Sequence, residues 1–421
     1  MDITPDVGVI LAREFFYYID SFLQESKSGF MSEEEVQKRC LEIFGEPSFT
    51  TSDVKRLTVG GKYVYQIKLR VLPFLEGMLY LVPDETQKAW TLVDTGSGDL
   101  ISNADFEKGI KIIREKYDSS FGLDQIACVF LTHAHVDHFG GIANLKRSAG
   151  CEVCAHVLES RLVESYDECA CVENNRYRFF LRESGVPLEM VEPILLGFGF
   201  LPGRVESVFV DRKLLGGEKV GNGTCIYLPG HSAGHICLLY DDVIFSGDLL
   251  LSKTLTQIWP ARVIPQTGVI NYVSSLLKLK KLAVVHEQKT GRKLVALPAH
   301  EEPVFDIPKR IDTIFRAMER RNKRLLRLLE EEKSPSSIWD LITKMYWSGR
   351  PNREFFALCD VASRIEYFLQ LNLVSVENYA RLSTEEPCLR YSTSLTNTES
   401  AKNTIEQVIR MNLAGDESYL I

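Results

Sequence analysis

A run of three histidines and one aspartate constrains this chain more than any other feature of its sequence. The run, His133-Ala134-His135-Val136-Asp137-His138, closely follows the apolar stretch Ile126–Leu131. Imidazole and carboxylate groups are ligands that zinc and other divalent first-row ions prefer, and a tight turn after a strand can aim all four side chains inward. A solvent-exposed polar loop is the alternative, but the whole chain contains only eight histidines. We therefore interpret the run as metal ligands at the end of a β-strand.

The run resembles the His-X-His-X-Asp-His signature of the metallo-β-lactamase superfamily. Four further stretches resemble the remaining motifs of that family and occur in the family's order. They are Leu92-Val93-Asp94-Thr95-Gly96, Leu228-Pro229-Gly230-His231-Ser232-Ala233-Gly234-His235, Phe245-Ser246-Gly247-Asp248-Leu249 and Leu297-Pro298-Ala299-His300. Each stretch follows an apolar strand, which is the context expected for ligands at one edge of a β-sandwich. His235 is expected to hydrogen-bond within its own turn.

The resemblance implies that two metal ions share one set of seven ligands. Those ligands are His133, His135, Asp137, His138, His231, Asp248 and His300. The first two histidines of the run would hold one ion together with His231. The second ion would be held by Asp137, His138 and His300, and Asp248 would touch both ions. Asp94 is expected to orient one of the ligands or its loop.

Two metal ions held roughly 3.5–4 Å apart lower the pKa of a bridging water and polarise a carbonyl or phosphoryl group. The resemblance therefore implies an enzyme that hydrolyses its substrate with a metal-bound hydroxide. Asp137 and Asp248 are the expected catalytic residues: Asp137 orients the hydroxide or returns a proton to the leaving group, and Asp248 bridges the ions. Zinc is the first expectation, with iron and manganese as alternatives. The flavodiiron branch has a glutamate where this chain has His135, which argues against that branch.

Changes in sequence pattern divide the chain into three predicted domains. Residues 1–60 carry helical spacing and are predicted to form a helical N-terminal extension. Residues 61–308 alternate short apolar strands with helical segments, and the resemblance implies that they form an α/β catalytic domain, an αββα sandwich of the metallo-β-lactamase type. Residues 309–421 are mostly helical and contain two short strand-like pieces, which is typical of a winged-helix-like region.

Composition sets limits on the partners and the compartment. With 421 residues, 45% of them hydrophobic, the chain can bury a large core without disulfides or metals. Acidic residues outnumber basic ones and give a net charge of −8, which argues against a general nucleic-acid or membrane-surface binder. The apolar stretch Val7–Leu23 is interrupted by Arg13, Glu14 and Asp20, so neither a signal peptide nor a membrane span is expected. A cytoplasmic protein with free or metal-bound thiols is therefore predicted.

Two further features, a group of cysteines and a group of basic residues, can each be interpreted in two ways. Cys151, Cys154, Cys169 and Cys171 are close enough in sequence for a second metal site, but the first two lie in an apolar strand where their side chains diverge. Buried free cysteine otherwise behaves as a small hydrophobic residue. Residues 309–327 carry eight basic residues, which form either a phosphate-contacting surface or the solvated face of a helix.

The expected function is hydrolysis of a thioester or ester, with a small acyl compound as the partner. The core resembles hydroxyacylglutathione hydrolase, a thioesterase of the same superfamily, and the C-terminal region resembles lactamase-like proteins that carry a winged helix. Because some of those proteins are single-strand endoribonucleases, RNA cleavage is the runner-up and nucleic acid a less favoured partner. A scaffold protein with a vestigial site is a third hypothesis, against which the complete ligand set argues. Substrate identity and self-association into a homo-oligomer stay open.

Overall fold

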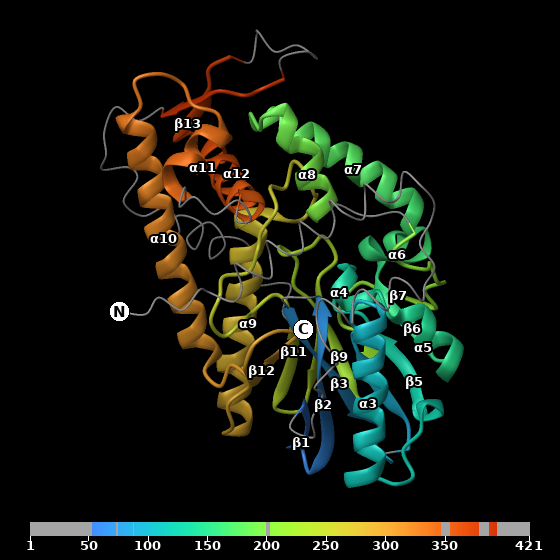
Figure 1. Ribbon diagram of the computed structural model, residues 1–421. Coiled ribbons are helices and arrows are strands. Elements are labelled where there is room, and N and C mark those ends of the chain that lie inside the picture. The colour runs from blue at the N-terminus through green and yellow to red at the C-terminus, as the bar shows by residue number, and fades with distance from the viewer. Residues whose placement is uncertain are drawn as a thin grey trace, which may run out of the picture.

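Two β-sheets packed face to face, with helices over both outer faces, form the architecture (Figure 1). The computed structural model describes residues 53–72, 75–86, 88–198, 203–346, 354–378 and 387–393. Within these ranges the layers are helices, a seven-stranded sheet, a five-stranded sheet and helices again. This arrangement confirms the predicted α/β fold and αββα sandwich. The helices expected before residue 53 lie outside the described residues.

The seven-stranded sheet forms the N-terminal half of the sandwich. Its strands, in spatial order, are β1 (Val54–Val59), β2 (Lys62–Leu72), β3 (Leu75–Pro83), β4 (Trp90–Val93), β5 (Ile126–Phe130), β6 (Glu152–His156) and β7 (Arg212–Leu214). Neighbours are antiparallel from β1 to β4 and parallel from β4 to β7. The turn Gly60-Gly61 has φ of +57° and +74°, which favours glycine, and it joins β1 and β2 into a hairpin. The prediction of helix up to residue 60 is therefore corrected: a strand begins at Val54, because this hairpin turn pairs it with β2.

The five-stranded sheet supplies the other inner layer. Its strands, in spatial order, are β12 (Val295–Pro298), β11 (Val243–Gly247), β10 (Ile236–Tyr240), β9 (Gly223–Tyr227) and β8 (Lys219–Val220). β11 and β12 are parallel, and the other neighbours are antiparallel. Two parallel strands end at the same edge of a sheet, so the residues that follow β11 and β12 lie close together.

Successive side chains of the strands point to opposite faces of each sheet and belong to different hydrophobic clusters. On β5, Val129 faces the helices outside the sheet, whereas Phe130 faces the second sheet. On β11, Ile244 faces the outer helices and Phe245 faces the first sheet. Successive side chains of a strand point to opposite faces, so strands buried on both sides have continuous apolar sequences. This explains why short apolar runs, without alternation, were sufficient to predict these strands.

Helices cover the two outer faces. In chain order they are α3 (Leu100–Lys116), α4 (Val136–Phe139), α5 (Ile142–Ala149), α6 (Val157–Glu164), α7 (Tyr166–Glu183), α8 (Leu188–Phe198), α9 (Gly268–Thr290), α10 (Ile307–Glu331), α11 (Ile338–Tyr346) and α12 (Glu354–Gln370), with a short 3-10 helix at Leu123–Gln125. α3 and α5 pack on the seven-stranded sheet, and α9 and α10 lie on the opposite side of the sandwich (Figure 1). Within the described ranges, no helix combines the length and apolarity needed to cross a bilayer.

One hydrophobic cluster continues across the predicted domain boundary at residue 308. It contains Ala296 of β12, Ile314 of α10 and Phe368 of α12, so packing shows no gap at that point, and the domain division stays a prediction. After α12, β13 (Val374–Val376) and β14 (Tyr391–Thr393) form an antiparallel pair. Within the connection between these strands, residues 379–386 lie outside the described residues, and the winged helix stays a prediction.

A buried charge network joins the three C-terminal helices. The Arg364 side chain on α12 is 3% exposed and donates hydrogen bonds to the main-chain oxygen of Met318 on α10 (3.1 Å) and to Asp360 Oδ1 (2.8 Å). Tyr346, at the end of α11, donates its hydroxyl to Asp360 Oδ2 at 2.6 Å. Burial alone would raise the pKa of Asp360, but Arg364, Arg321 and the hydroxyl of Tyr346 together outweigh burial and lower that pKa to about 2.

Replacement Asp360→Asn is expected to lower the free energy of unfolding by about 3–5 kcal/mol, because Arg364 would stay buried without its counter-charge. Urea unfolding at pH 7 measures the loss; exposed Asp124→Asn is the control, expected within about 0.5 kcal/mol of wild type. In wild type the folded pKa of Asp360 lies below the unfolded value of about 3.9. Its stabilisation is therefore complete above that pH and is lost as the pH falls through about 2. A loss below about 1 kcal/mol at pH 7 would contradict this role.

Candidate metal centre

The predicted ligands lie at one edge of the sandwich, where strands of both sheets end. β5 runs into the loop that carries the histidine run, whereas β11 and β12 end just before Asp248 and His300. The loop after β9 carries His231. The main-chain N–H of Ile236, at the start of β10, donates to the carbonyl of Thr132 at 2.9 Å and joins the two sheets at this edge. The fold thus brings together all seven side chains that the sequence predicted.

The first group of ligand-type atoms consists of three ring nitrogens. His133 Nε2 lies 2.9 Å from His135 Nδ1 and 3.2 Å from His231 Nε2, and the latter two nitrogens are 3.0 Å apart. Such spacing fits one ion, because ligands of a tetrahedral zinc lie about 3.3 Å apart at the usual bond lengths. Burial lowers the pKa of His135 to about 3, and the neighbouring His231 adds to the effect. Neutral imidazole is the form that binds a metal ion.

The second group combines two imidazoles with two carboxylates. His300 Nε2 lies 3.4 Å from Asp137 Oδ2 and 3.5 Å from Asp248 Oδ1, and His138 Nε2 lies 3.6 Å from the same two oxygens. These separations are too long for good hydrogen bonds but close to the spacing of ligands around one ion. Burial would lower the pKa of His300, but the carboxylates of Asp248 and Asp137 outweigh it and raise that pKa to about 9. A metal ion bound at this group would displace a proton from His300.

Asp248 faces both groups. Its Oδ2 lies 3.6 Å from His231 Nε2 in the first group, and its Oδ1 lies 3.5 Å from His300 Nε2 in the second. Three buried atoms, Asp248 Oδ1, His300 Nε2 and His138 Nε2, have no hydrogen-bond partner among the described residues. Buried polar atoms are rarely left without a partner in native proteins. These three atoms converge in the second group and fit one divalent ion, and the three ring nitrogens of the first group fit another.

Asp94 fixes the ring of His138. Its carboxylate accepts hydrogen bonds from His138 Nδ1 at 2.9 Å and from the main-chain N–H and hydroxyl of Thr132, each at 2.8 Å. The Nδ1 proton of His138 is thereby held, which leaves Nε2 free for a metal ion. Asp94 has φ of +60°, so the chain turns sharply after β4 to bring the carboxylate under the loop. The geometry matches the orienting role expected for Asp94 from the sequence.

Main-chain carbonyls fix two further rings in the same way. His231 Nδ1 lies 2.9 Å from the carbonyl oxygen of Gln257, and His300 Nδ1 lies 2.6 Å from that of Glu76. In each ring the Nδ1 proton is donated to the carbonyl, so Nε2 is the atom presented to a metal ion. These carbonyls lie 26 and 224 residues away in sequence from the histidines that they hold, and no local pattern could have indicated them.

Glu159 is a buried carboxylate that sequence reasoning missed. On α6, its Oε1 accepts hydrogen bonds from the hydroxyl of Ser232 (2.7 Å) and the main-chain N–H of Gly234 (2.6 Å), and its Oε2 accepts one from the N–H of Ala134 (3.2 Å). The carboxylate thus ties the loop of the histidine run to the loop that carries His231. A glutamate on an amphipathic helix has no sequence signature that separates it from a surface residue.

Replacement Glu159→Gln is expected to weaken metal binding about 10- to 100-fold, because partners that orient ligands typically contribute that much. The amide nitrogen would face the N–H of Ala134, so one bond is lost, whereas Glu159→Ala removes all three and is expected to weaken binding further. Competition with a chelating dye measures the affinity. Glu168→Gln, an exposed glutamate on α7, is the matched control. Unchanged affinity in Glu159→Ala would show that the loops keep their positions without the carboxylate.

The main-chain carbonyl of His235 accepts a hydrogen bond from the N–H of Leu228 at 3.0 Å, within its own turn as the sequence had suggested, but the side chain bonds outside that turn. Its Nε2 instead accepts a hydrogen bond from the main-chain N–H of Asp248 at 3.2 Å. Gly247, with φ of +49°, allows this approach, since a Cβ there would lie only 2.8 Å from His235 Nε2. His235 therefore positions the loop that carries Asp248 and is not itself one of the predicted ligands. The sequence could not reveal this, because the two loops follow different strands.

The cysteines do not join these groups. Among the described residues, every group of three ligand-type atoms close enough to hold an ion consists of histidine and aspartate. Cys154 instead lies against Cys128 on the neighbouring strand, with 3.1 Å between the sulfur atoms, and Cys171 is exposed. The second metal site raised by the spacing of Cys151, Cys154, Cys169 and Cys171 is thus not formed in the described part of the chain.

Comparisons with known proteins agree with this geometry. A sequence model of the metallo-beta-lactamase superfamily matches residues 77–284, about half of the chain. Acyl-coenzyme A thioesterase MBLAC2 of Bos taurus is 27% identical over 201 residues, which are 45% of this chain and 63% of that protein. Hydroxyacylglutathione hydrolase of Shewanella sp. (strain ANA-3) is 24% identical over 183 residues, 42% of this chain and 50% of that protein. The chain therefore spans between half and two-thirds of the length of these relatives.

A solved structure shows the same fold. The metallo-beta-lactamase family protein TTHA1429 from Thermus thermophilus superposes with a TM-score of 0.58 at 21% identity, over 78% of this chain and 98% of that one. Family match, fold and clustered histidines and aspartates point to one conclusion. The chain belongs to the metallo-beta-lactamase superfamily.

Proposed function

We propose that this chain is a dinuclear metal-dependent hydrolase that cleaves a thioester or ester. The observation that carries the proposal is the position of Asp248, whose two oxygens face two separate groups of histidine nitrogens. The names of two relatives, an acyl-coenzyme A thioesterase and a hydroxyacylglutathione hydrolase, support an acyl substrate. Mixed histidine and carboxylate ligands suit zinc, and they are also compatible with iron and manganese.

The chain's own residues define the open side of the centre. The His133 and His138 rings are almost fully buried, whereas the side chains of Asp137 and Asp248 are 16% and 14% exposed. Two divalent ions held there would polarise a substrate carbonyl and lower the pKa of a water. Asp137 would accept a proton from the attacking water and return it to the sulfur or oxygen of the leaving group. Asp248 would hold the two ligand groups at a fixed separation.

The test is to assay the metal-loaded chain side by side on acyl thioesters, simple esters, lactones and single-stranded RNA. We expect turnover of a thioester or ester that depends on added metal. Turnover of RNA alone would overturn the proposal in favour of the runner-up, an endoribonuclease. The observation that favours that runner-up is a group of basic side chains on α10, which a phosphate backbone could contact.

Salt dependence is expected to separate the two enzyme classes. An RNA substrate binds by phosphate contacts, so affinity should fall by roughly one power of salt concentration per contact. A small acyl substrate involves few charges, and kcat/KM should change less than about threefold between 50 and 200 mM salt. The net charge of −8 repels a long polyanion and favours the shallow dependence. A steep decrease in kcat/KM for the thioester would contradict this expectation.

A further inference from the structure

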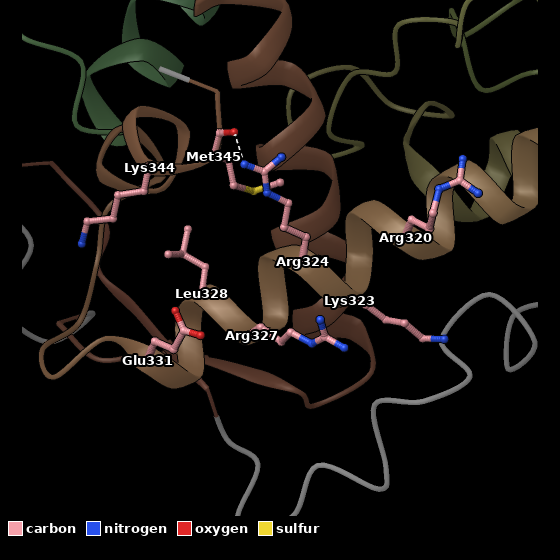
Figure 2. Close-up of a pocket in the computed structure, with 8 residues that line it drawn as sticks. All are labelled: Arg320, Lys323, Arg324, Arg327, Leu328, Glu331, Lys344 and Met345. Carbon is pink, nitrogen blue, oxygen red and sulfur yellow. Dashed lines mark hydrogen bonds between the residues drawn. The ribbon is translucent and has the colours of Figure 1, made fainter. Parts of the chain in front are cut away.

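A pocket between α10 and α11 lies apart from the metal centre. Its volume is about 380 Å³, and the residues that line this basic pocket are Arg320, Lys323, Arg324, Arg327, Leu328, Glu331, Lys344 and Met345 (Figure 2). Five of the eight lining side chains are cationic and one is acidic. The volume falls within the range of small-molecule sites, about 300–1,000 Å³. The metal centre does not use these residues.

Three cations of the basic pocket are available to an anion. Arg320 and Arg327 are exposed and have no hydrogen-bond or ion-pair partner among the described residues. Lys344 pairs with Glu332 at 2.6 Å, but the lysine side chain is 44% exposed, and pairs this open contribute little stability. Lys344 can therefore leave the carboxylate of Glu332 and bind an anionic ligand instead. Arginine is well suited to phosphate, because its planar guanidinium donates two parallel hydrogen bonds.

The pocket also has an apolar part. Figure 2 shows the Leu328 side chain between Lys344 and Arg324, with Met345 above it. Arg324 donates a hydrogen bond to the main-chain oxygen of Met345 at 2.6 Å, which holds this arginine against α11. A bare phosphate would leave Leu328 and Met345 uncovered. A ligand that carries both phosphates and an apolar or aromatic ring matches the two kinds of lining.

The position on α10 separates this pocket from the metal centre. Arg310, near the start of α10, donates to the carbonyl of Leu251 at 2.6 Å, three residues beyond Asp248. Arg324 lies fourteen residues further along, which is about 21 Å of helix. Glu330, Glu331 and Glu332 end the basic surface on one side. Toward the start of α10, Arg310 is bonded to the carbonyls of Leu251 and Thr254, and Arg321 pairs with Asp360, so the part of the surface that is open to a ligand is short. A short basic surface fits a small phosphorylated molecule better than a nucleic-acid strand.

We propose that the basic pocket binds the diphosphate group of a nucleotide, with Arg320 and Arg327 of α10 on the phosphates and the base against Leu328. Two sources share this chemistry: a free nucleoside diphosphate, and the nucleotide end of a coenzyme A compound. The binding proposal does not depend on the proposed hydrolase function, because nucleotide binding can be measured when no substrate is hydrolysed. Only the assignment to the second source rests on that function.

Isothermal titration calorimetry of the full-length chain with ADP, coenzyme A and adenosine tests the proposal. We expect ADP and coenzyme A to bind with submillimolar affinity, to compete with each other, and to bind at least tenfold more tightly than adenosine. The double variant Arg320→Ala with Arg327→Ala should lose at least tenfold in affinity for ADP. Arg316→Ala, an exposed arginine of the same helix outside the pocket, is the control and should change the affinity less than twofold.

Further measurements identify the source and can overturn the proposal. If the double variant raises KM for an acyl-coenzyme A thioester with unchanged kcat, while KM for a phosphate-free thioester stays the same, the nucleotide end of the substrate occupies the pocket. If ADP binds but KM for both thioesters is unchanged, a free nucleotide is the ligand. Failure of ADP to bind at 5 mM would overturn the proposal. So would ADP binding that the double variant does not weaken, or single-stranded RNA that binds more tightly than ADP and is not displaced by it.

Discussion

Replacement of Asp248 by alanine is expected to lower thioester or ester hydrolysis by at least about a thousandfold while the chain stays folded. Asp248 is the side chain that both ligand groups share, so its loss leaves each group one carboxylate oxygen short. Without this shared ligand, two bound ions would no longer be held at a fixed separation. The loss of several kcal/mol of transition-state stabilisation explains the size of the effect.

Folding should survive this substitution. The three hydrophobic clusters hold the sandwich and its helices together without the metal centre, and a chain of this size buries enough apolar surface to fold. Measurements of kcat/KM and a circular-dichroism melt of the metal-loaded protein check both parts. Asp124→Ala, an exposed aspartate, is the control and should keep full activity. Activity within tenfold of wild type, or an unfolded Asp248→Ala chain at room temperature, would contradict the expectation.

The second large effect concerns the metal ions themselves. We expect close to two divalent ions per chain, because the described residues form two groups of ligand-type atoms joined by Asp248. Prolonged chelation should abolish hydrolysis, and zinc should restore it. The holoprotein should also unfold at a higher temperature, since a ligand at 1,000 times its dissociation constant adds about 4 kcal/mol to the free energy of unfolding.

Elemental analysis and thermal melts before and after chelation measure these effects. His133→Ala removes one nitrogen of the first group and is expected to leave close to one tightly bound ion. A chain that carries no metal, and takes up none when zinc, manganese or iron is added, would remove the basis of the proposed hydrolase. A wild-type stoichiometry of one would show that only one of the groups is a true site.

The ligand set could be predicted from sequence because the histidine run and the other motifs resemble those of the metallo-β-lactamase superfamily, and each motif lies at the end of a short apolar strand. The histidine run follows β5, Asp248 follows β11 and His300 follows β12, so local patterns carried the information. The residues that hold these ligands could not be found in this way. Glu159 lies on a helix, and the carbonyl partner of His300 belongs to Glu76 on β3, 224 residues earlier. Such contacts exist only after tertiary packing.

The same distinction explains the errors in the fold. The strand β1 was missed because its sequence, VKRLTV, is half polar, and its three polar residues are exposed at the sheet edge. Its pairing with β2, through a glycine turn, decides its structure. The basic side of α10 was seen from its sequence, but the pocket against α11 needed the packing of two helices and could not be predicted.

The division of the ligands between two sheets also constrains the order in which the chain acquires its metal ions. His133 and His300 lie about 170 positions apart in sequence, and the ligand groups exist only after the two sheets have docked. An ion held across that edge would join the two sheets there. Hydrogen exchange of the amides of Thr132 and Ile236 should then slow on metal addition more than exchange at the opposite edge. Metal binding would then be a late event in folding, and it would occur only after the two sheets have docked.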